Sequence, residues 1–279
     1  MPIKDLFLPL IGEPGEATLA AIDKCVAVAG DFAAKICAVA IEEDIMVRPQ
    51  VISPDLDNSE TTEAIRSVTD AQGLLKAFDS AALRFGVRNE QKIMRLAAAD
   101  IAPNLAEQAR LKDLSLVLVK SHSNQSEKMI EQLLFKSGRP ILLCPEELAS
   151  SLPVAFSHVV IAWDQSAPAA RAVADALPVL QSAETVRIIT ATDKRSAEEM
   201  RSGADLVSHL AEHGIKATFE TVKIGGSSVG KVFESHVRAN AIDLLVMGGY
   251  RHTRLSEIVW GGATKTVIGQ PPCWVMMSH

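Results

Sequence analysis

The sequence predicts an α/β protein with two similar halves, each a doubly wound, five-stranded parallel sheet. Short apolar runs alternate with longer amphipathic segments along all 279 residues, a pattern typical of parallel strands joined by right-handed helical crossovers. Aromatic residues make up only 4% of the chain, so aliphatic side chains must fill the cores, as they do where helices cover a parallel sheet. The order of strands and helices in the first half also recurs in the second.

In the first half, β-branched and apolar runs predict five strands, and amphipathic stretches predict four helices. The strands are Asp5–Leu10, Lys35–Ile41, Lys92–Ala97, Ser115–Lys120 and Pro140–Cys144. The helices are Gly15–Gly30, Glu60–Phe85, Asp100–Lys112 and Gln125–Phe135. The Pro- and Asp-containing stretch Glu42–Ser59 is expected to be a surface loop.

The second half repeats the order. Its expected strands are His158–Trp163, Thr185–Ala191, Lys216–Lys223, Asp243–Gly248 and Cys273–Met277. Its expected helices are Pro168–Gln181, Ser196–Glu212, Ser228–Ala239 and Glu257–Val267.

Three pairs of segments indicate an internal duplication. Residues 115–120 match 243–248, residues 139–144 match 271–276, and residues 5–10 match 159–164. The first half is longer between its matched segments, and the loop at 42–59 is expected to hold the extra residues. The boundary falls near Glu146–Phe156, which contains two serines and Pro153. We therefore expect one domain over residues 1–148 and a second over residues 155–279.

Composition excludes several classes of protein. The net charge is −6 and no Lys/Arg cluster is present, so binding to nucleic acid or to an anionic membrane is not expected. No apolar run is long enough to form a transmembrane helix, and the N-terminal residues lack the basic and apolar regions of a signal peptide. The four cysteines are far apart in the sequence, which is typical of reduced, buried thiols in a cytoplasmic protein.

Polar residues and glycines gather at expected strand ends in the second half. Asp164 follows the first strand and would lie at the carboxyl edge of the sheet, where ligands bind in open α/β folds. The alternative is that Asp164 only caps the next helix. Gly248 and Gly249 end the fourth strand, where glycine permits positive φ and close approach of a ligand.

A second glycine pair lies in the segment Trp260-Gly261-Gly262-Ala263-Thr264. Each glycine costs a helix about 1 kcal/mol relative to alanine, so a purpose beyond simple packing is expected. Backbone amides here, with the Thr264 hydroxyl, would suit a phosphate group. The alternative is that the glycines only allow a helix to pack tightly on the sheet.

The stretch from Val246 to Val267 resembles the signature of the universal stress proteins, whose nucleotide-binding members carry G-x2-G-x9-G-[ST] after the fourth strand. Residues 272–276, Pro-Cys-Trp-Val-Met, resemble the fifth strand of that family, and residues 162–166, Ala-Trp-Asp-Gln-Ser, resemble its first strand end. The resemblance covers the whole second half. The first half resembles tandem members in the order of its elements and in Ser137-Gly138-Arg139-Pro140.

The resemblance implies a Rossmann-like fold of the adenine nucleotide α-hydrolase type and a cytoplasmic stress-response protein that binds ATP or AMP, with or without Mg²⁺, mainly in its second half. Asp164 would contact the adenine, Ala191 would line the base or ribose, and the glycines would approach the phosphates. The full expected site is Ala162, Trp163, Asp164, Ala191, Gly248, Arg251, His252, Gly261, Gly262, Ala263 and Thr264. The resemblance also implies that the halves pair within one chain, and it allows a homodimer of the chain.

Two departures from the family pattern concern the phosphates. Arg251 stands where the pattern has its second glycine, and Gly262 stands where Ser or Thr is usual. The guanidinium of Arg251 would either close the site or bind the phosphates. The first half departs further, because its first strand ends without an Asp, its fourth ends without glycines, and only Ser137 and Gly138 remain of the cradle. We therefore expect nucleotide in the second half alone, and a nucleotide-free scaffold protein is the alternative.

No acid–base pair or activated nucleophile can be identified, so at most slow ATP hydrolysis is expected. Residues 225–231 fit GxxxxGK, but Val232 replaces the Mg²⁺-binding Ser or Thr. A glycine turn followed by a Ser228 cap is therefore expected there. His209 and His213 have the HxxEH spacing of zinc hydrolases. No third ligand suggests itself, so no metal site is expected.

Overall fold

The computed structural model describes residues 2–45, 59–147, 152, 154–194, 196–249, 251–254, 257–260 and 262–279. The strands of the first half are β1 (Asp5–Leu10), β2 (Lys35–Glu43), β3 (Asn89–Leu96), β4 (Leu114–Val119) and β5 (Ile141–Pro145). Its helices are α1 (Glu16–Asp31), α2 (Ser59–Phe85), α3 (Ala98–Ala109) and α4 (Asn124–Lys136). Most of the expected surface loop Glu42–Ser59 lies outside the described residues.

In the second half, the sheet strands are β6 (His158–Ala162), β7 (Thr185–Ala191), β8 (Ala217–Val222), β9 (Leu244–Gly248) and β12 (Trp274–Ser278). Its helices are α5 (Ala167–Leu180), α6 (Ala197–Glu212), α7 (Val229–Ala239) and α8 (Gly262–Gly269). The short strands β10 (Arg251–Arg254) and β11 (Glu257–Trp260) form an antiparallel hairpin. The helix predicted over Glu257–Val267 is therefore wrong in its first turns, because the chain is extended up to Trp260.

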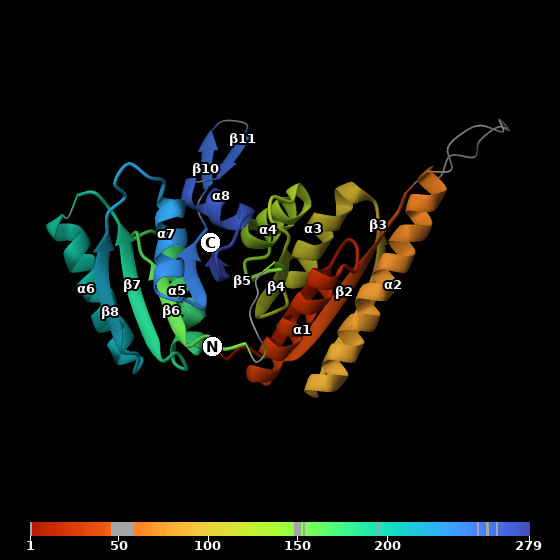
Figure 1. Cartoon of the computed structure of the whole chain (residues 1–279), viewed down its shortest axis with the longest axis horizontal. Helices are drawn as coiled ribbons and strands as arrows, with labels where there is room; N and C mark the ends of the chain where they lie inside the picture. The colour runs from red at the N-terminus through yellow and green to blue at the C-terminus, as the bar shows by residue number, and fades with distance from the viewer. Residues whose placement is uncertain are drawn as a thin grey trace.

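The ten sheet strands form one sheet in the order β3-β2-β1-β4-β5-β12-β9-β6-β7-β8. Each half contributes five neighbouring parallel strands, and only the β5–β12 pair at the centre is antiparallel. Figure 1 shows the two halves side by side, with helices on both faces of this sheet. The α/β prediction is confirmed. The domain limits 1–148 and 155–279 remain a prediction, because part of the segment between the halves lies outside the described residues.

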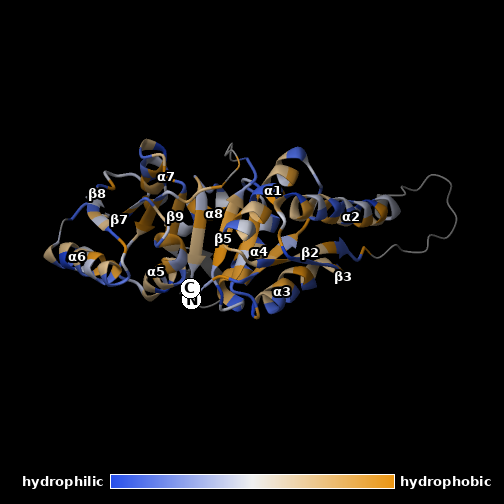
Figure 2. Ribbon diagram, turned by 90° about the horizontal axis from the view of Figure 1, so that it is seen from below, coloured by the Kyte–Doolittle hydropathy of each residue, from blue (hydrophilic) through white to orange (hydrophobic). Residues whose placement is uncertain are grey.

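Two apolar clusters cover the two faces of the sheet. One cluster combines inward-facing strand residues with α1, α2, α5 and α6, and the other combines the opposite strand faces with α3, α4, α7 and α8. Figure 2 shows hydrophobic residues concentrated on the strands and on the helix faces that meet them. Alternate residues of the central strands thus enter different cores, which explains why these strands are apolar throughout.

The duplication is visible in the hydrogen bonds at two strand starts. Asp113 Oδ2 accepts from the backbone N of Asp5, and Asp243 Oδ2 accepts from the backbone N of His158. Leu114 then pairs with Leu6, and Leu244 pairs with Val159. Asp113 therefore corresponds to Asp243, and Asp5 corresponds to His158. The sequence-based matches of Ser115 with Asp243 and of Asp5 with Val159 are wrong by two positions and one position.

An approximate twofold axis passes through the join between the halves. Ser115 pairs with Ile141 and Leu245 pairs with Val275, so Ile141 corresponds to Val275 and Leu142 corresponds to Met276. Across the join, Leu142 pairs directly with Met276. Leu142 and Met276 thus face each other as counterparts, and the pairs on either side of them are related by the same axis, as at the centre of a symmetric dimer.

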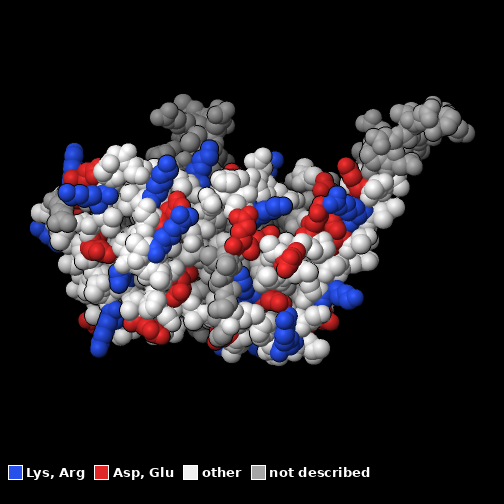
Figure 3. Space-filling view, viewed as in Figure 1, with Lys and Arg blue, Asp and Glu red and all other residues white. Residues whose placement is uncertain are grey.

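Helix hydropathy, surface charge and the state of the cysteines are three properties that the composition also addresses. Among the described residues no helix is long and apolar enough to cross a membrane. Acidic and basic side chains are interspersed on the face shown in Figure 3. All four cysteines are free and buried, and burial raises the pKa of the Cys25 and Cys273 thiols, the latter to about 12. Reactive thiolates are therefore not expected at these two positions.

Candidate functional site

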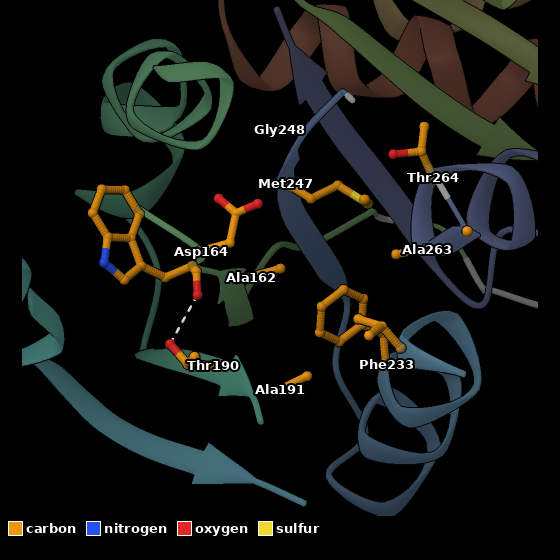
Figure 4. Close-up of a pocket in the computed structure, with 12 residues that line it drawn as sticks. Ala162, Asp164, Thr190, Ala191, Phe233, Met247, Gly248, Ala263 and Thr264 are labelled. Carbon is orange, nitrogen blue, oxygen red and sulfur yellow. Dashed lines mark hydrogen bonds between the residues drawn. The ribbon is translucent and has the colours of Figure 1, made fainter. Parts of the chain in front are cut away.

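A cavity of about 310 Å³ opens at the carboxyl edge of the second-half sheet, where β6, β7 and β9 end beside α7 and α8. It is lined by Ala162, Trp163, Asp164, Thr190, Ala191, Val229, Phe233, Met247, Gly248, Gly262, Ala263 and Thr264. Figure 4 shows the Asp164 carboxylate on the side of Gly248 and the Phe233 ring across the cavity beside Ala191 and Ala263. The structure thus brings together eight of the eleven residues expected from the sequence.

The side chain of Asp164 supports the turn that leads into α5. Its Oδ1 accepts from the backbone N of Ser166 at 3.0 Å, and the residue is exposed at the cavity. The helix cap itself is Ser166, whose Oγ accepts from the backbone N of Ala169. The suggestion that Asp164 is the helix cap is therefore wrong, because Asp164 lies two residues before the cap Ser166 and lines the cavity.

The turn after β6 has a backbone conformation that side chains rarely adopt. Gln165 has a φ of 65°, and the corresponding residue of the first half, Gly12, has a φ of 94°. Left-handed backbone at a residue other than glycine is uncommon and costs free energy. The turn that presents Asp164 is thus common to both halves.

Two hydrogen bonds fix the position of Trp163 at the edge of the cavity. Thr190 Oγ1 donates to the backbone O of Trp163 at 2.8 Å, as Figure 4 shows. Trp163 Nε1 donates to Ser202 Oγ on α6 at 2.8 Å. The indole N–H is therefore already satisfied, and Trp163 contributes a fixed wall rather than a donor to a ligand.

Gly248 is explained by packing. It is not among the residues with positive φ. A Cβ placed on it would lie 2.6 Å from Ala169 N and 2.7 Å from Pro168 C. The start of α5 therefore packs directly on the backbone at the end of β9, and glycine is the residue that allows it. The expectation of positive φ at Gly248 is therefore wrong, and the close approach that the structure shows is that of the α5 backbone. Close approach of a ligand to Gly248 remains a prediction.

The first turn of α8 forms another wall. A Cβ on Gly262 would have no atom within 4 Å, so this glycine leaves open space at the cavity rather than permitting a packing contact. Thr264, next to Ala263, is only 2% exposed. Backbone N–H groups at the start of a helix lack intrahelical partners and favour anionic groups.

The structure adds four lining residues that the sequence did not single out: Thr190, Val229, Phe233 and Met247. Thr190 and Met247 precede expected site residues on β7 and β9, so inclusion of strand-end neighbours would have found them. Val229 and Phe233 lie on α7, whose placement beside the cavity has no local sequence signal. Gly261 and the side chains of Arg251 and His252 lie outside the described residues.

The structure shows what the two other motifs form in the described part of the chain. Gly225 and Gly226 have positive φ, and Ser228 Oγ accepts from Lys231 N at the start of α7. This is the expected glycine turn and serine cap. The rings of His209 and His213 stack edge to face at 4.9 Å, and the described residues contain no group of three metal-ligating side chains.

The first half has a corresponding cavity of different chemistry. Pro9, Ile11 and Leu118 correspond to Ala162, Asp164 and Gly248, and all three line a cavity of about 340 Å³. The carboxylate and the glycine of the second half are thus replaced by aliphatic side chains. Ser137 and Gly138, expected as the remnant of a glycine cradle, instead end α4, where Gly138 has a φ of 69°. That part of the prediction is wrong.

Glu146 lies in this first-half cavity and accepts from Thr18 Oγ1 at 3.1 Å. Burial raises the pKa of its carboxyl group, so ionisation of Glu146 opposes folding as the pH rises from the unfolded-state pKa through the folded-state pKa. We expect Glu146→Gln to raise the denaturation midpoint at about pH 7 and to change it little at about pH 4, where glutamate is largely protonated.

The matched control for this comparison is Glu107→Gln, which removes an exposed carboxylate from α3. Urea denaturation at the two pH values measures the effect. A Glu146→Gln gain that is equally large at both pH values would show that desolvation of the charge is not its cause.

Comparison with known proteins identifies the second half. Residues 155–279 match the model of the Universal stress protein family. This half of the chain belongs to the universal stress protein family. The match covers the strand ends, glycines and short helix that line the cavity. A search of curated protein sequences finds no significant match.

Solved structures extend the family fold to the whole chain. A universal stress protein from Archaeoglobus fulgidus DSM 4304 superposes with a TM-score of 0.68 at 14% identity, covering 98% of this chain and 97% of that one. A protein from Pseudomonas aeruginosa UCBPP-PA14 gives 0.63 at 14% identity, covering 99% and 93%. A functionally unknown protein from P. aeruginosa PAO1 gives 0.62 at 14% identity, covering 99% and 92%. The tandem universal stress protein fold is therefore confirmed.

Proposed function

We propose that the second half of this tandem universal stress protein binds an adenine nucleotide, ATP or AMP, in the cavity beside Asp164, and that the first half does not. The observation that carries the proposal is the convergence on one 310 Å³ cavity of a carboxylate, small strand-end residues and the open start of α8. These groups come from the ends of three strands and from one helix, which are far apart in the sequence.

The cavity suits the parts of a nucleotide. Ala162, Ala191, Phe233 and Met247 offer an apolar surface to a flat base, and most small-molecule sites combine such a surface with a few polar groups. The Asp164 carboxylate can accept hydrogen bonds from an amino or hydroxyl group. The start of α8, with open space at Gly262, can face a phosphate.

Substitutions at Asp164 test the proposal. Asp164→Asn keeps an oxygen that can accept from Ser166 N but removes the charge, whereas Asp164→Ala removes both. Because a hydrogen bond to a charged group contributes about 1.5–3 kcal/mol, we expect Asp164→Ala to weaken ATP and AMP binding roughly 10- to 100-fold. Isothermal titration measures the affinity, and thermal shift with each nucleotide checks it, since a ligand of the folded state raises its stability.

Lys231→Ala is the control for the alternative phosphate site at residues 225–231. Lys231 is exposed at the start of α7 and does not line the cavity, so its loss is expected to leave binding unchanged. Equal losses from the Asp164 and Lys231 variants would favour the glycine turn instead. No binding of ATP or AMP by the unaltered chain would favour a nucleotide-free scaffold, and two sites per chain would contradict the assignment to one half.

A further inference from the structure

The backbone beside the cavity is in direct contact with the first half of the chain. Gly249 follows Gly248, which lines the cavity, and its N donates to Ser278 O at 2.8 Å. A Cβ on Gly249 would lie 2.4 Å from Leu134 Cδ2 on α4. Leu134 therefore packs against the backbone of Gly249 so closely that no side chain fits between them.

The same backbone segment has a second link to α4. His279 Nδ1 lies at 3.0 Å from Gly249 O, within hydrogen-bonding distance. The His279 ring also stacks edge to face on Phe135 with the ring centroids 4.6 Å apart. Two consecutive residues of α4, Leu134 and Phe135, thus hold the segment that leaves β9.

The other wall of the cavity is also attached to the first half. Helix α8 lines the cavity with its first turn, and at its last residue Gly269 O accepts from His122 N at 2.8 Å. His122 has a φ of 57°, an uncommon conformation for a residue with a side chain. Because α8 has only 8 residues, a shift at its far end moves the cavity wall with it.

We propose that Leu134 is a positioning residue for the nucleotide site of the other half. It holds the Gly248–Gly249 backbone in the place where it can meet the ligand, and it links that site to the first half, which carries no nucleotide. The proposal rests on the proposed function of the second half. It assigns α4 of the first half a part in binding rather than only in folding.

Shortening Leu134 is expected to displace the site because Leu134 contacts the backbone of Gly249 rather than a side chain. Interiors are close-packed, so a side chain removed from a core leaves space into which its neighbours relax. With Leu134 shortened, the relaxing neighbour is the main chain of Gly249, and Gly248 moves with it. Binding geometry is sensitive to displacements of about 1 Å.

Leu134→Ala tests the proposal against Leu105→Ala as the matched control. Leu105 is also fully buried, in the same core, but it lies on α3, on the side of α4 away from α8 in Figure 1. We expect Leu134→Ala to weaken nucleotide binding about tenfold by isothermal titration, in the range of coupling through packed networks. Leu105→Ala is expected to lower the melting temperature at least as much and to change the affinity less than about twofold. Equal affinity losses from both variants would overturn the proposal.

The variant pair at the contact itself gives a second measurement. Gly249→Ala places a methyl group 2.4 Å from Leu134 Cδ2, so the backbone or Leu134 must shift. In the double variant Leu134→Ala/Gly249→Ala the new methyl group occupies the vacated space. We expect the double variant to bind nucleotide more tightly than either single variant. Additive losses would show that the two positions act independently and would overturn the proposal.

Hydrogen exchange of the ligand-free chain separates this inference from the proposed function. The Gly249 amide, which donates to Ser278 O, is expected to exchange faster in Leu134→Ala than in Leu105→Ala. If the unaltered chain binds no nucleotide, the proposed function fails, whereas this exchange difference still shows that Leu134 holds the segment. If nucleotide binds and the Gly249 exchange rate is the same in both variants, Leu134 does not position the site.

Discussion

Replacing Gly248 with alanine is expected to lower the free energy of unfolding by about 3 kcal/mol, the upper part of the range for overpacking a close-packed interior. The new Cβ would lie 2.6 Å from Ala169 N and 2.7 Å from Pro168 C. Both atoms belong to the backbone, so no side-chain rotation relieves the overlap. Either the first turn of α5 or the end of β9 must move.

Gly262→Ala is the matched control, because it adds the same methyl group at the same cavity. No atom lies within 4 Å of the position of its Cβ, and the residue begins α8. Alanine favours a helix over glycine by up to about 1 kcal/mol, so this variant is expected to be as stable as the unaltered chain or more stable.

Urea denaturation of the ligand-free variants measures both effects without any assumption about a ligand. If Gly248→Ala unfolds at the same urea concentration as the unaltered chain, α5 does not pack on β9 as closely as the structure shows. If Gly262→Ala lowers the free energy of unfolding as much as Gly248→Ala does, both Gly248 and Gly262 are required for packing. The argument for an open phosphate site at the start of α8 is then weaker.

The convergence of the site could be predicted because the topology of parallel sheets is restrictive. In an α/β sheet all parallel strands end at one edge, so residues that follow separate strands meet there whatever their distance in sequence. Asp164 and Gly248 were found on this ground, Ala191 was expected only from the family resemblance, and all three line one cavity. Phe233 was not found in this way. Which side of a helix faces a site depends on how the helix packs on the sheet, and the sequence of the helix alone does not determine that packing.

The position of the last helix was predicted incorrectly for a local reason. The residues Glu257–Trp260 fit a helical pattern when joined to the segment that follows them. Ile258, Val259 and Trp260 are β-branched or aromatic, however, and such residues favour strands. In the structure they pair antiparallel with β10. Gly262 begins α8, whereas the sequence pattern predicts a helix that begins at Glu257.

The internal alignment was wrong by one or two positions because the central strands are apolar on both faces. A strand with one solvated face has a two-residue alternation that fixes its phase, whereas Leu114–Val119 is buried at every position. Polar residues, not apolar ones, fix the alignment of the two halves. Asp113 and Asp243 each accept a hydrogen bond from the first strand of their own half. Two aspartates just before equivalent strands were the signal in the sequence.

Leu142→Ala is expected to destabilise both halves of the chain together by about 2–5 kcal/mol, the cost of truncating a buried leucine. Leu142 is 2% exposed and pairs across the join with Met276, which is 1% exposed. The join is a continuous part of one sheet, since β12 is hydrogen-bonded to β5 on one side and to β9 on the other. A loss at this position therefore weakens the first half and the second half at once.

The positions of the tryptophans allow a test of whether the two halves unfold together. The chain has 3 tryptophans, and Trp163, Trp260 and Trp274 all lie in the second half. Tryptophan fluorescence thus reports the second half, whereas far-ultraviolet circular dichroism reports both. If the sheet unfolds as one unit, Leu142→Ala moves the urea midpoint of both signals equally, as coincident transitions require. An earlier dichroism transition with unchanged fluorescence would mean that residues 1–148 and 155–279 unfold independently, and that the join contributes little to the stability of either half.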